Sequence, residues 1–414
     1  MNIAMLSYHT CPLATLGGKD TGGMNVYVAE LTRHLGPLGI HVDVFTRSQD
    51  DHVPHVVHCL GYGNRVVHIP AGPEVPLPKP ELPVYIPKFV EGIERFASEK
   101  GIRYDLVHSH YWMSGIAAES LKKDWNAPVL QMFHTLGKMK NRIAQSPEEI
   151  EGDYRIQGEL KVMGMADRII AATQAEESQL EFLYGIRSDK ITVIPPGVNT
   201  TRFYPIPEDE AAEAIRVPGS GKLMLFVGRI EALKGIDILL RALALMKQRG
   251  IFVDHPHRLV IIGGDPDDKT LSETAEMARI KALSKELGIG DLVIFLGKRD
   301  QETLPYYYSA AEVLIMPSHY ESFGMVALEA MACGTPVVAS QIGGLAFLVQ
   351  DGVTGYVVPD GEPELLSQKL TQLILDPKLL ARLGKQAAEY AQGYRWEAIT
   401  DQIVDVYNQL RKQA

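Results

Sequence analysis

The 414-residue chain has few cysteines, no long apolar run and no excess of positive charge. Its three cysteines, Cys11, Cys59 and Cys333, lie far apart, which excludes a disulfide framework and the ligand spacing of a zinc site. No run of about 18 apolar residues is present, so we expect no membrane-spanning helix. The net charge of −10 argues against a general nucleic-acid binder or an anionic membrane partner. We therefore expect a reduced, cytoplasmic, globular protein.

Familiar nucleotide-binding signatures are also missing. The glycine-rich stretch Gly17-Gly-Lys-Asp-Thr-Gly-Gly23 lacks the Gly-Lys-Ser/Thr of a Walker A loop and is not a complete GxGxxG. This weakens the ATP and dinucleotide interpretations. Met1 to Met5 already has the pattern of a strand, so we expect no signal peptide. The chain is too long for one ordinary core, which predicts two domains.

The first half of the chain alternates between strand and helix patterns, which predicts a doubly wound parallel sheet. We predict strands at residues 2–7, 42–46, 66–69, 106–111, 129–134, 168–173 and 191–195, and helices at 24–35, 88–100 and 153–166. Residues 71–87 are rich in proline and are predicted to form a loop that carries Lys79. Ligands of such sheets bind beyond the carboxyl ends of the strands. His110, His134 and Thr135 fall at that edge.

The alternation restarts after Pro195-Pro-Gly-Val-Asn199, which we interpret as a hinge. We predict strands at residues 223–227, 259–262, 293–296, 313–316, 337–339 and 355–358, and helices at 236–248, 325–333 and 377–414. Residues 399–410 are amphipathic, so the last helix could return to the first domain. The predicted domains are therefore residues 1–198 and 199–390, with a C-terminal helix at 391–414.

Residues 316–335 predict a strand, a polar loop and a helix, which aims backbone N–H groups and a positive dipole end at an anion. Glu321 falls in the loop and Glu329 inside the helix. Carboxylates repel a phosphate, but they accept hydrogen bonds from sugar hydroxyls. The pattern indicates a nucleotide sugar, whereas the alternative is a solvated pair of glutamates at a helix start.

Two cations and a glycine add to this interpretation. Arg229 and Lys234 lie in one predicted strand-to-helix loop, where two positive charges suit a pyrophosphate. The alternative is that both are surface cations. Gly23 comes just before the helix at 24–35, and its lack of a Cβ lets its backbone N–H approach a ligand.

The spacing of Glu321 and Glu329, the dipeptide Gly228-Arg229 with Lys234, and residues 195–199 together carry a resemblance. The chain resembles the family 4 retaining glycosyltransferases over essentially its whole length. The resemblance implies the GT-B fold, an α/β architecture of two facing Rossmann-like domains with a cleft between them. It implies a UDP-sugar donor bound by Gly23, Arg229, Lys234, Glu321, Ser322, Phe323, Gly324, Met325 and Glu329. The implied catalytic residues are His134, Arg229, Lys234 and Glu321.

Two groups within the family resemble this chain most. Gly22-Gly-Met-Asn-Val-Tyr-Val28 and residues 134–141 are similar to the mycothiol-pathway transferase, which puts N-acetylglucosamine on inositol phosphate. Asp20-Thr-Gly-Gly23 is similar to sucrose-phosphate synthases. Both groups use a phosphorylated acceptor, and the resemblance implies that it is bound by Asn25, Lys79, Tyr111, Thr135 and Arg155.

Composition leads us to expect sucrose biosynthesis, because the chain lacks the alanine and arginine excess of a mycothiol producer. The predicted reaction therefore moves glucose from UDP-glucose to fructose 6-phosphate, giving sucrose 6-phosphate. The first alternative moves N-acetylglucosamine from its UDP-sugar to inositol 1-phosphate. A second alternative, from a different class, is a non-catalytic regulator that binds a nucleotide sugar. A homo-oligomer is left open.

The resemblance implies that the leaving phosphate takes the acceptor's proton, without a fixed protein base, and that the domains close about residues 195–199. His134 is expected to contact the transferred sugar, whereas His110 could be purely structural. We expect no cofactor and no metal, since cations and a helix dipole stabilise the leaving group. Asp265-Pro-Asp267 has the form of a DxD metal motif, but we interpret it as a turn.

Overall fold

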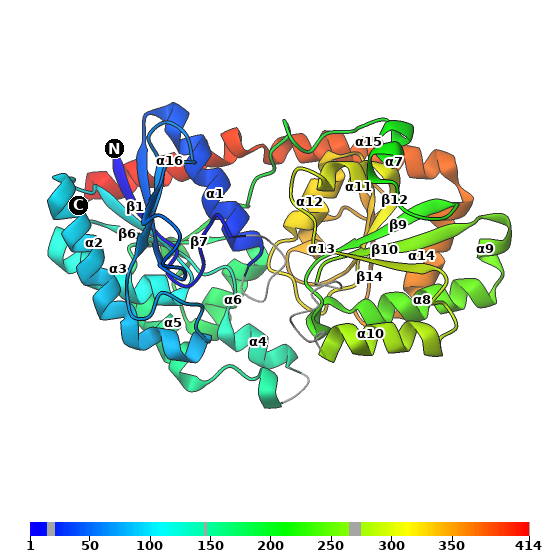
Figure 1. Cartoon of the computed structure of the whole chain (residues 1–414), viewed down its shortest axis with the longest axis horizontal. Helices are drawn as coiled ribbons and strands as arrows, with labels where there is room; N and C mark the ends of the chain where they lie inside the picture. Colours follow the sequence, from blue (N-terminus) through cyan, green and yellow to red (C-terminus); the bar gives the residue numbers. More distant parts are fainter. Residues whose placement is uncertain (15–20, 145–146, 265–274, 414) are drawn as a thin grey trace. The chain divides into compact units, whose positions relative to one another are not determined.

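The computed structural model describes residues 1–14, 21–144, 147–264 and 275–413. These residues form two compact units (Figure 1). The first unit contains the described residues 1–14 and 21–196 and is rejoined by the chain from Trp396 onward. The second unit contains Gly197–Arg395. Each unit has its own sheet and its own apolar core.

The sheet of the first unit has the strand order β3-β4-β2-β1-β5-β6-β7-β8. Its strands are β1 (Asn2–Leu6), β2 (His41–Arg47), β3 (Val56–Val57), β4 (Arg65–Ile69), β5 (Leu106–His110), β6 (Val129–Met132), β7 (Arg168–Ala171) and β8 (Ile191–Val193). All neighbours pair in parallel except β3 and β4. The sequence did not predict β3, because two residues are too short for a periodic pattern.

Helices between these strands and the C-terminal helix complete the first unit. They are α1 (Gly23–Leu35), α2 (Ile86–Lys100), α3 (Trp112–Trp125), α4 (Gly137–Ile143), α5 (Asp153–Met165), α6 (Gln174–Tyr184) and α16 (Trp396–Gln413), with short 3-10 helices η1 (Gly36–Leu38), η2 (Lys79–Tyr85), η3 (Pro147–Glu149) and η4 (Ser188–Lys190). The prediction of a loop at 71–87 was wrong in its second half. Pro80 and Pro87 lie in the first turns of η2 and α2, where a missing N–H costs nothing.

Helix α16 packs on α1 within the first unit (Figure 1). Its buried face consists of Trp396, Ile399, Thr400, Ile403, Val406, Tyr407 and Leu410, which repeat at helical spacing. The Trp396 ring meets the edge of Tyr27 in α1, with 5.3 Å between the ring centroids. The predicted single helix at 377–414 was wrong, because the 3-10 turn η6 (Gln392–Tyr394) separates α16 from the helix before it.

The second unit has a fully parallel sheet with the order β11-β10-β9-β12-β13-β14. Its strands are β9 (Lys222–Val227), β10 (His257–Ile262), β11 (Val293–Gly297), β12 (Ala311–Met316), β13 (Val337–Ser340) and β14 (Gly355–Val358). Its helices are α7 (Glu208–Ile215), η5 (Ala232–Lys234), α8 (Ile236–Gln248), α9 (Ile251–Asp254), α10 (Ala275–Glu286), α11 (Leu304–Ala310), α12 (Met325–Ala332), α13 (Leu345–Leu348), α14 (Pro363–Leu375), α15 (Pro377–Ala391) and η6.

Both sheets reverse their winding direction at one point. In the first unit, β2 and then β4 are added on one side of β1. The later strands β5, β6, β7 and β8 are added in turn on its other side. In the second unit the equivalent strands are β9 and β12. Such a switch point leaves a crevice at the carboxyl ends of the two strands, where α/β proteins bind ligands. Among the described residues, no helix combines the length and apolar character needed to cross a membrane.

Candidate active site

The loops that follow β9 and β12 meet at the switch point of the second unit. Lys234 Nζ lies 2.6 Å from Glu321 Oε2, and each side chain is 17% exposed. The His319 N–H donates to the Leu233 carbonyl at 2.9 Å, which ties the two loops together. Gly235 allows this contact, because a Cβ there would lie 2.0 Å from the Pro317 oxygen. The sequence predicted both Lys234 and Glu321, but not that they pair.

Arg229 lies in the same loop as Lys234 and is more exposed. Its Nη1 is 2.7 Å from Glu231 Oε1, and its side chain is 39% exposed. Such an exposed ion pair contributes little to stability. An anion could therefore compete with Glu231 for the Arg229 guanidinium at small cost.

The loop before α12 is shaped by two glycines that sequence reasoning missed. The Gly344 N–H donates to the Glu321 carbonyl at 3.0 Å. A Cβ on Gly343 would lie 2.0 Å from the Glu321 oxygen, and one on Gly344 would lie 2.3 Å from the Phe323 Cα. These are backbone contacts that cannot move aside, so the predicted donor loop at 321–324 depends on a glycine pair. The available signal was the dipeptide Gly-Gly between β13 and α13.

Ser322 lies in the same loop, Phe323 is buried, and Gly324 begins α12 at φ +105°. Met325 is the first residue of the helix. Glu329 is 5% exposed one turn further on and accepts from Tyr308 Oη at 2.9 Å and Gln301 Nε2 at 3.3 Å. These two donors orient the Glu329 carboxylate. Its predicted contact with ribose hydroxyls stays a prediction.

In the first unit, the start of α1 carries two predicted residues in different environments. Gly23 is exposed in the first turn of this 13-residue helix. Asn25 is 1% exposed, and its amide donates to Thr10 Oγ1 at 2.8 Å and to the Cys11 carbonyl at 2.7 Å. Both amide hydrogens of Asn25 are thus used inside the protein, where they hold the loop after β1.

Four residues predicted as acceptor ligands come together at the ends of β5 and β6. The Tyr111 ring lies 5.2 Å from Arg155 Cζ and 5.7 Å from Lys79 Nζ. Arg155 Nη2 donates to the Thr135 carbonyl at 3.2 Å and to its hydroxyl at 3.0 Å. Burial raises the pKa of Tyr111 to about 12, so its hydroxyl stays a neutral donor. The positive φ of Tyr111, +72°, is a strained conformation of the kind found at functional sites.

The Arg155 guanidinium is bound by two carboxylates that were not predicted from the sequence. Arg155 Nε donates to Glu159 Oε1 at 2.9 Å, and Nη1 donates to Glu151 Oε1 at 2.5 Å. Glu159 is fully buried and also accepts from the Gly137 N–H and from Tyr184 Oη. The spacing of four residues from Arg155 to Glu159 was a signal for Glu159, because it places these two side chains on one face of α5, whereas Glu151 lies before that helix.

The histidines at the same edge are linked to each other. His110 Nδ1 lies 3.0 Å from His134 Nε2, and His108 Nδ1 lies 2.8 Å from Tyr407 Oη in α16. Burial lowers the pKa of His134 to about 3 and holds that of His110 well below its ordinary value. Both imidazoles are therefore neutral and act as hydrogen-bonding groups. His110 is fully buried, whereas His134 is partly exposed at φ +61°.

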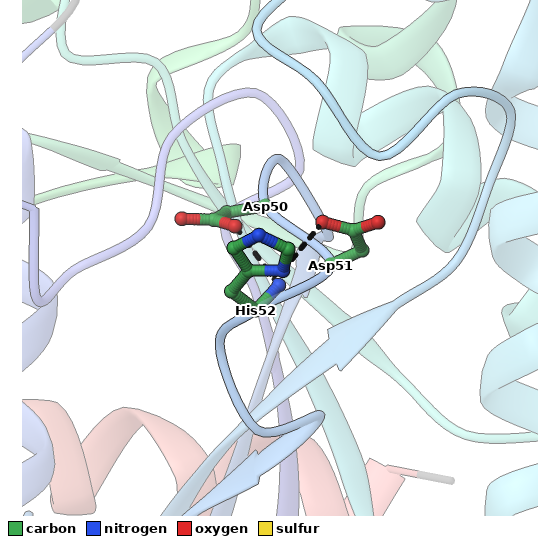
Figure 2. Close-up of side chains that lie close together, drawn as sticks. All are labelled: Asp50, Asp51 and His52. Carbon is green, nitrogen blue, oxygen red and sulfur yellow. Dashed lines mark hydrogen bonds and ion pairs between the residues drawn. The ribbon is translucent and has the colours of Figure 1, made fainter.

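One cluster of side chains has the composition of a metal site. Figure 2 shows Asp50, Asp51 and His52 together on an exposed turn after β2, with ligand atoms within 4.8 Å of one another. Acidic turns of this kind are common without an ion. The DxD motif Asp265-Pro-Asp267 and the glycine-rich residues 17–20 lie outside the described residues. The expectation that the reaction uses no metal stays a prediction.

Two Rossmann-like units, each with a polar site at its switch point, define a GT-B glycosyltransferase fold. Residues 21–202 match the family model described as Glycosyltransferase Family 4, and residues 207–390 match Glycosyl transferases group 1. The chain belongs to glycosyltransferase family 4. The family and the fold predicted from the sequence are confirmed.

Individual relatives cover nearly the whole chain. A D-inositol 3-phosphate glycosyltransferase of Acidothermus cellulolyticus is 41% identical over 98% of this chain and 89% of its own. A D-inositol 3-phosphate glycosyltransferase 2 of Catenulispora acidiphila is 40% identical over 98% and 94%. Among solved structures, a sucrose-phosphate synthase of Thermosynechococcus elongatus is 36% identical, covers both chains completely and superposes with a TM-score of 0.90.

Proposed function

We propose that this glycosyltransferase moves a sugar from a UDP-sugar to an acceptor that carries a phosphate monoester, and that the acceptor is an inositol phosphate. The observation that carries the proposal is the cluster of Lys79 and Arg155 on the ring of Tyr111, with Thr135 beside Arg155. A phosphate monoester carries about 1.5 to 2 negative charges at pH 7. Cations with neutral hydroxyl donors are the groups that bind it.

The choice of inositol phosphate follows the relatives, whose names specify D-inositol 3-phosphate at 40–41% identity. This reverses the preference for fructose 6-phosphate that composition favoured. Composition averages over the whole chain, so it carries no information about the few side chains that face an acceptor. Fructose 6-phosphate stays the second candidate because of the backbone match with the sucrose-phosphate synthase.

The second unit supplies the groups for the donor. We assign the pyrophosphate to Arg229, Lys234 and the N-terminal turn of α12, whose dipole favours negative charge. Glu321 is held by Lys234 at the entrance of that turn and accepts from hydroxyls of the transferred sugar. Negative charge grows on the β-phosphate as the sugar leaves, and the departing phosphate takes the acceptor's proton. The neutral His134 donates a hydrogen bond to a sugar hydroxyl.

A UDP-release assay in the presence of EDTA tests the proposal. UDP-N-acetylglucosamine and UDP-glucose are each offered with inositol 1-phosphate, inositol 3-phosphate and fructose 6-phosphate. We expect release with an inositol phosphate only. Release with fructose 6-phosphate alone establishes the second candidate. Binding of UDP-sugar without release in any combination contradicts the enzyme proposal and favours the non-catalytic regulator.

Substitution in the cation cluster separates acceptor from donor effects. Lys79→Ala should raise the acceptor KM at least tenfold, because a charge-assisted hydrogen bond of about 1.5–3 kcal/mol is lost, and leave UDP affinity unchanged. Lys88→Ala is the matched control, since Lys88 is an exposed lysine of the adjacent helix α2. Arg155→Ala is a poorer probe, because it strands the buried Glu159 carboxylate and could destabilise the unit by about 3–5 kcal/mol.

A further inference from the structure

We propose that the Glu151 carboxylate is an internal ligand of the phosphate site: it occupies the cations of the site in the free protein and leaves them when a phosphorylated acceptor binds. This inference rests on the proposed function, since it takes the cluster around Tyr111 as the site of the acceptor's phosphate. It makes Glu151 a residue that determines specificity, by setting the charge an acceptor must bring.

The contacts of Glu151 are those that a phosphate oxygen would make. Glu151 Oε1 accepts from Arg155 Nη1 at 2.5 Å and also from Lys140 Nζ. The charges of Arg155, Lys140 and Lys79 all lower the pKa of Glu151, and together they outweigh the effect of its burial. The carboxylate is therefore ionised, and all three cations act on it.

Glu151 differs from Glu159, the other carboxylate on Arg155. Glu159 is fully buried, and Gly137, Tyr184 and Arg155 all donate to it, so it is a fixed part of the structure. The Glu151 side chain is 19% exposed. Its main chain is held by Asn141, whose side chain accepts from the Glu151 N–H at 2.6 Å and donates to the Glu151 carbonyl at 3.1 Å. Displacing the carboxylate therefore requires only a side-chain rotation.

The charges of the cluster support an exchange of anions. With Glu151 in place, three cations face two carboxylates, which leaves a formal charge of +1. With Glu151 turned away, the same cations face Glu159 alone, and the formal charge of +2 matches a phosphate dianion. Keeping both anions on Arg155 Nη1 would place like charges in contact, which is costly in a partly buried site.

The exchange selects for strongly charged acceptors. A neutral polyol carries no negative charge to replace the ion pairs that Arg155 and Lys140 form with Glu151. A dianion makes the same hydrogen bonds with more charge and displaces the carboxylate. The unphosphorylated form of an acceptor is thus rejected by competition with Glu151, in addition to the hydrogen bonds it lacks.

Calorimetric titration with inorganic phosphate tests this on the full chain. We compare the wild type with Glu151→Gln and with Glu99→Gln, which makes the same change in net charge at an exposed position of α2. Removing the competing charge should lower the phosphate Kd of Glu151→Gln by about tenfold. Glu99→Gln should match the wild type. An equal or higher Kd for Glu151→Gln overturns the proposal, because it means that Glu151 does not compete with phosphate.

A crystal structure of the wild type with phosphate provides a second readout that needs no variant to fold. We expect the hydrogen bond between Glu151 and Arg155 Nη1 to be replaced by one from Arg155 to the phosphate. If that bond persists beside bound phosphate, the proposal is wrong. Failure of the proposed function gives a different result: none of the three proteins binds phosphate, and the wild type turns over no phosphorylated acceptor. That result overturns both the proposed phosphorylated acceptor and the proposed displacement of Glu151.

Discussion

At the scale of single residues, the site depends on charges held in place by other charges. Arg155 is 2% exposed and uses its guanidinium in three directions, toward Glu159, Glu151 and Thr135. A buried arginine with only one of these partners would be strongly destabilising. The same carboxylates that stabilise Arg155 also fix the plane of its guanidinium. Arg155, the proposed ligand of the acceptor's phosphate, is therefore already oriented before an acceptor binds.

Another buried carboxylate, Glu176 in α6, predicts a pH dependence of stability. Burial raises the pKa of Glu176 to about 7 from an ordinary 4.5. The folded state thus holds this proton more tightly than the unfolded state, so stability falls as the pH rises from about 4.5 through 7. At about 1.4 kcal/mol per pKa unit, the loss above pH 7 reaches about 3 kcal/mol.

Glu176→Gln should therefore stabilise the first unit at pH 8 by about 2–3 kcal/mol and have little effect at pH 5. The glutamine keeps an oxygen for the Ala172 N–H, which now donates to Glu176 Oε2 at 2.7 Å. Urea unfolding at the two pH values measures the difference. Glu177→Gln, in the same helical turn, is the control. A stabilisation that is equal at pH 5 and pH 8 would show that Glu176 does not titrate in this window.

At the scale of elements, each loop of the site is shaped by a neighbour rather than by its own residues. In the second unit, the backbone of the loop between β12 and α12 packs against Gly343 and Gly344. In the first unit, Arg47 at the end of β2 donates to the Pro73 and Val75 carbonyls, both at 2.6 Å. Those bonds hold the proline-rich segment that leads to Lys79. The positions of Glu321 and Lys79 thus depend on side chains and turns elsewhere in the sheet.

Gly344→Ala should disturb the donor loop without unfolding the unit. The added Cβ meets the Phe323 backbone at 2.3 Å, so the start of α12 must shift. We expect UDP affinity to fall at least tenfold, because anion binding at a helix start depends on aligned N–H groups. Calorimetry with UDP measures this. Gly393→Ala is the matched control, since a Cβ there meets nothing within 4 Å. Unchanged UDP affinity in Gly344→Ala would mean that the α12 turn does not hold the nucleotide.

At the scale of the whole molecule, two Rossmann-like units divide the proposed reaction. Most proposed donor ligands belong to the second unit and the proposed acceptor ligands to the first, whereas Gly23 and His134 are donor-contacting residues proposed in the first unit. The net charge of −10 does not oppose the binding of two anionic substrates. Exposed charges act over only about 8 Å at physiological ionic strength, so the local cations decide.

Hydrogen exchange should separate the two ligands by unit. UDP should slow the amides of residues 232–235 and 321–328, whereas an inositol phosphate should slow those of 137–143 and 151–159. Bound ligands suppress local opening, so protection reports where each ligand contacts the chain. Mass spectrometry on peptides measures both patterns. Protection by UDP confined to the first unit would contradict the assignment of the nucleotide to the second.

The alternation of strand and helix patterns predicted two doubly wound domains and the strand ends at which polar residues gather. The GT-B fold and the family were expected from a resemblance, which is carried by motifs whose residues lie close together, such as Glu321 to Glu329. The sequence was not enough for η2, for the break between α15 and α16, or for β3. Prolines at the start of η2 override the periodic signal, and the two residues of β3 are too few to show one. The turn that separates α15 from α16 contains Gly393 and interrupts an otherwise helical pattern.

Which charged side chains pair with one another depends on the packed fold and was not predicted from the sequence. Lys234 and Glu321 are 87 residues apart and pair because β9 and β12 are neighbours in the sheet. Lys140 lies in α4 and Glu151 just before α5, and no expectation from the sequence paired them. Gly344, the residue before α13, supports the donor loop through its N–H. A sequence specifies which side chains are present at strand ends, but partners are set by strand order and register, which arise only when the whole core packs.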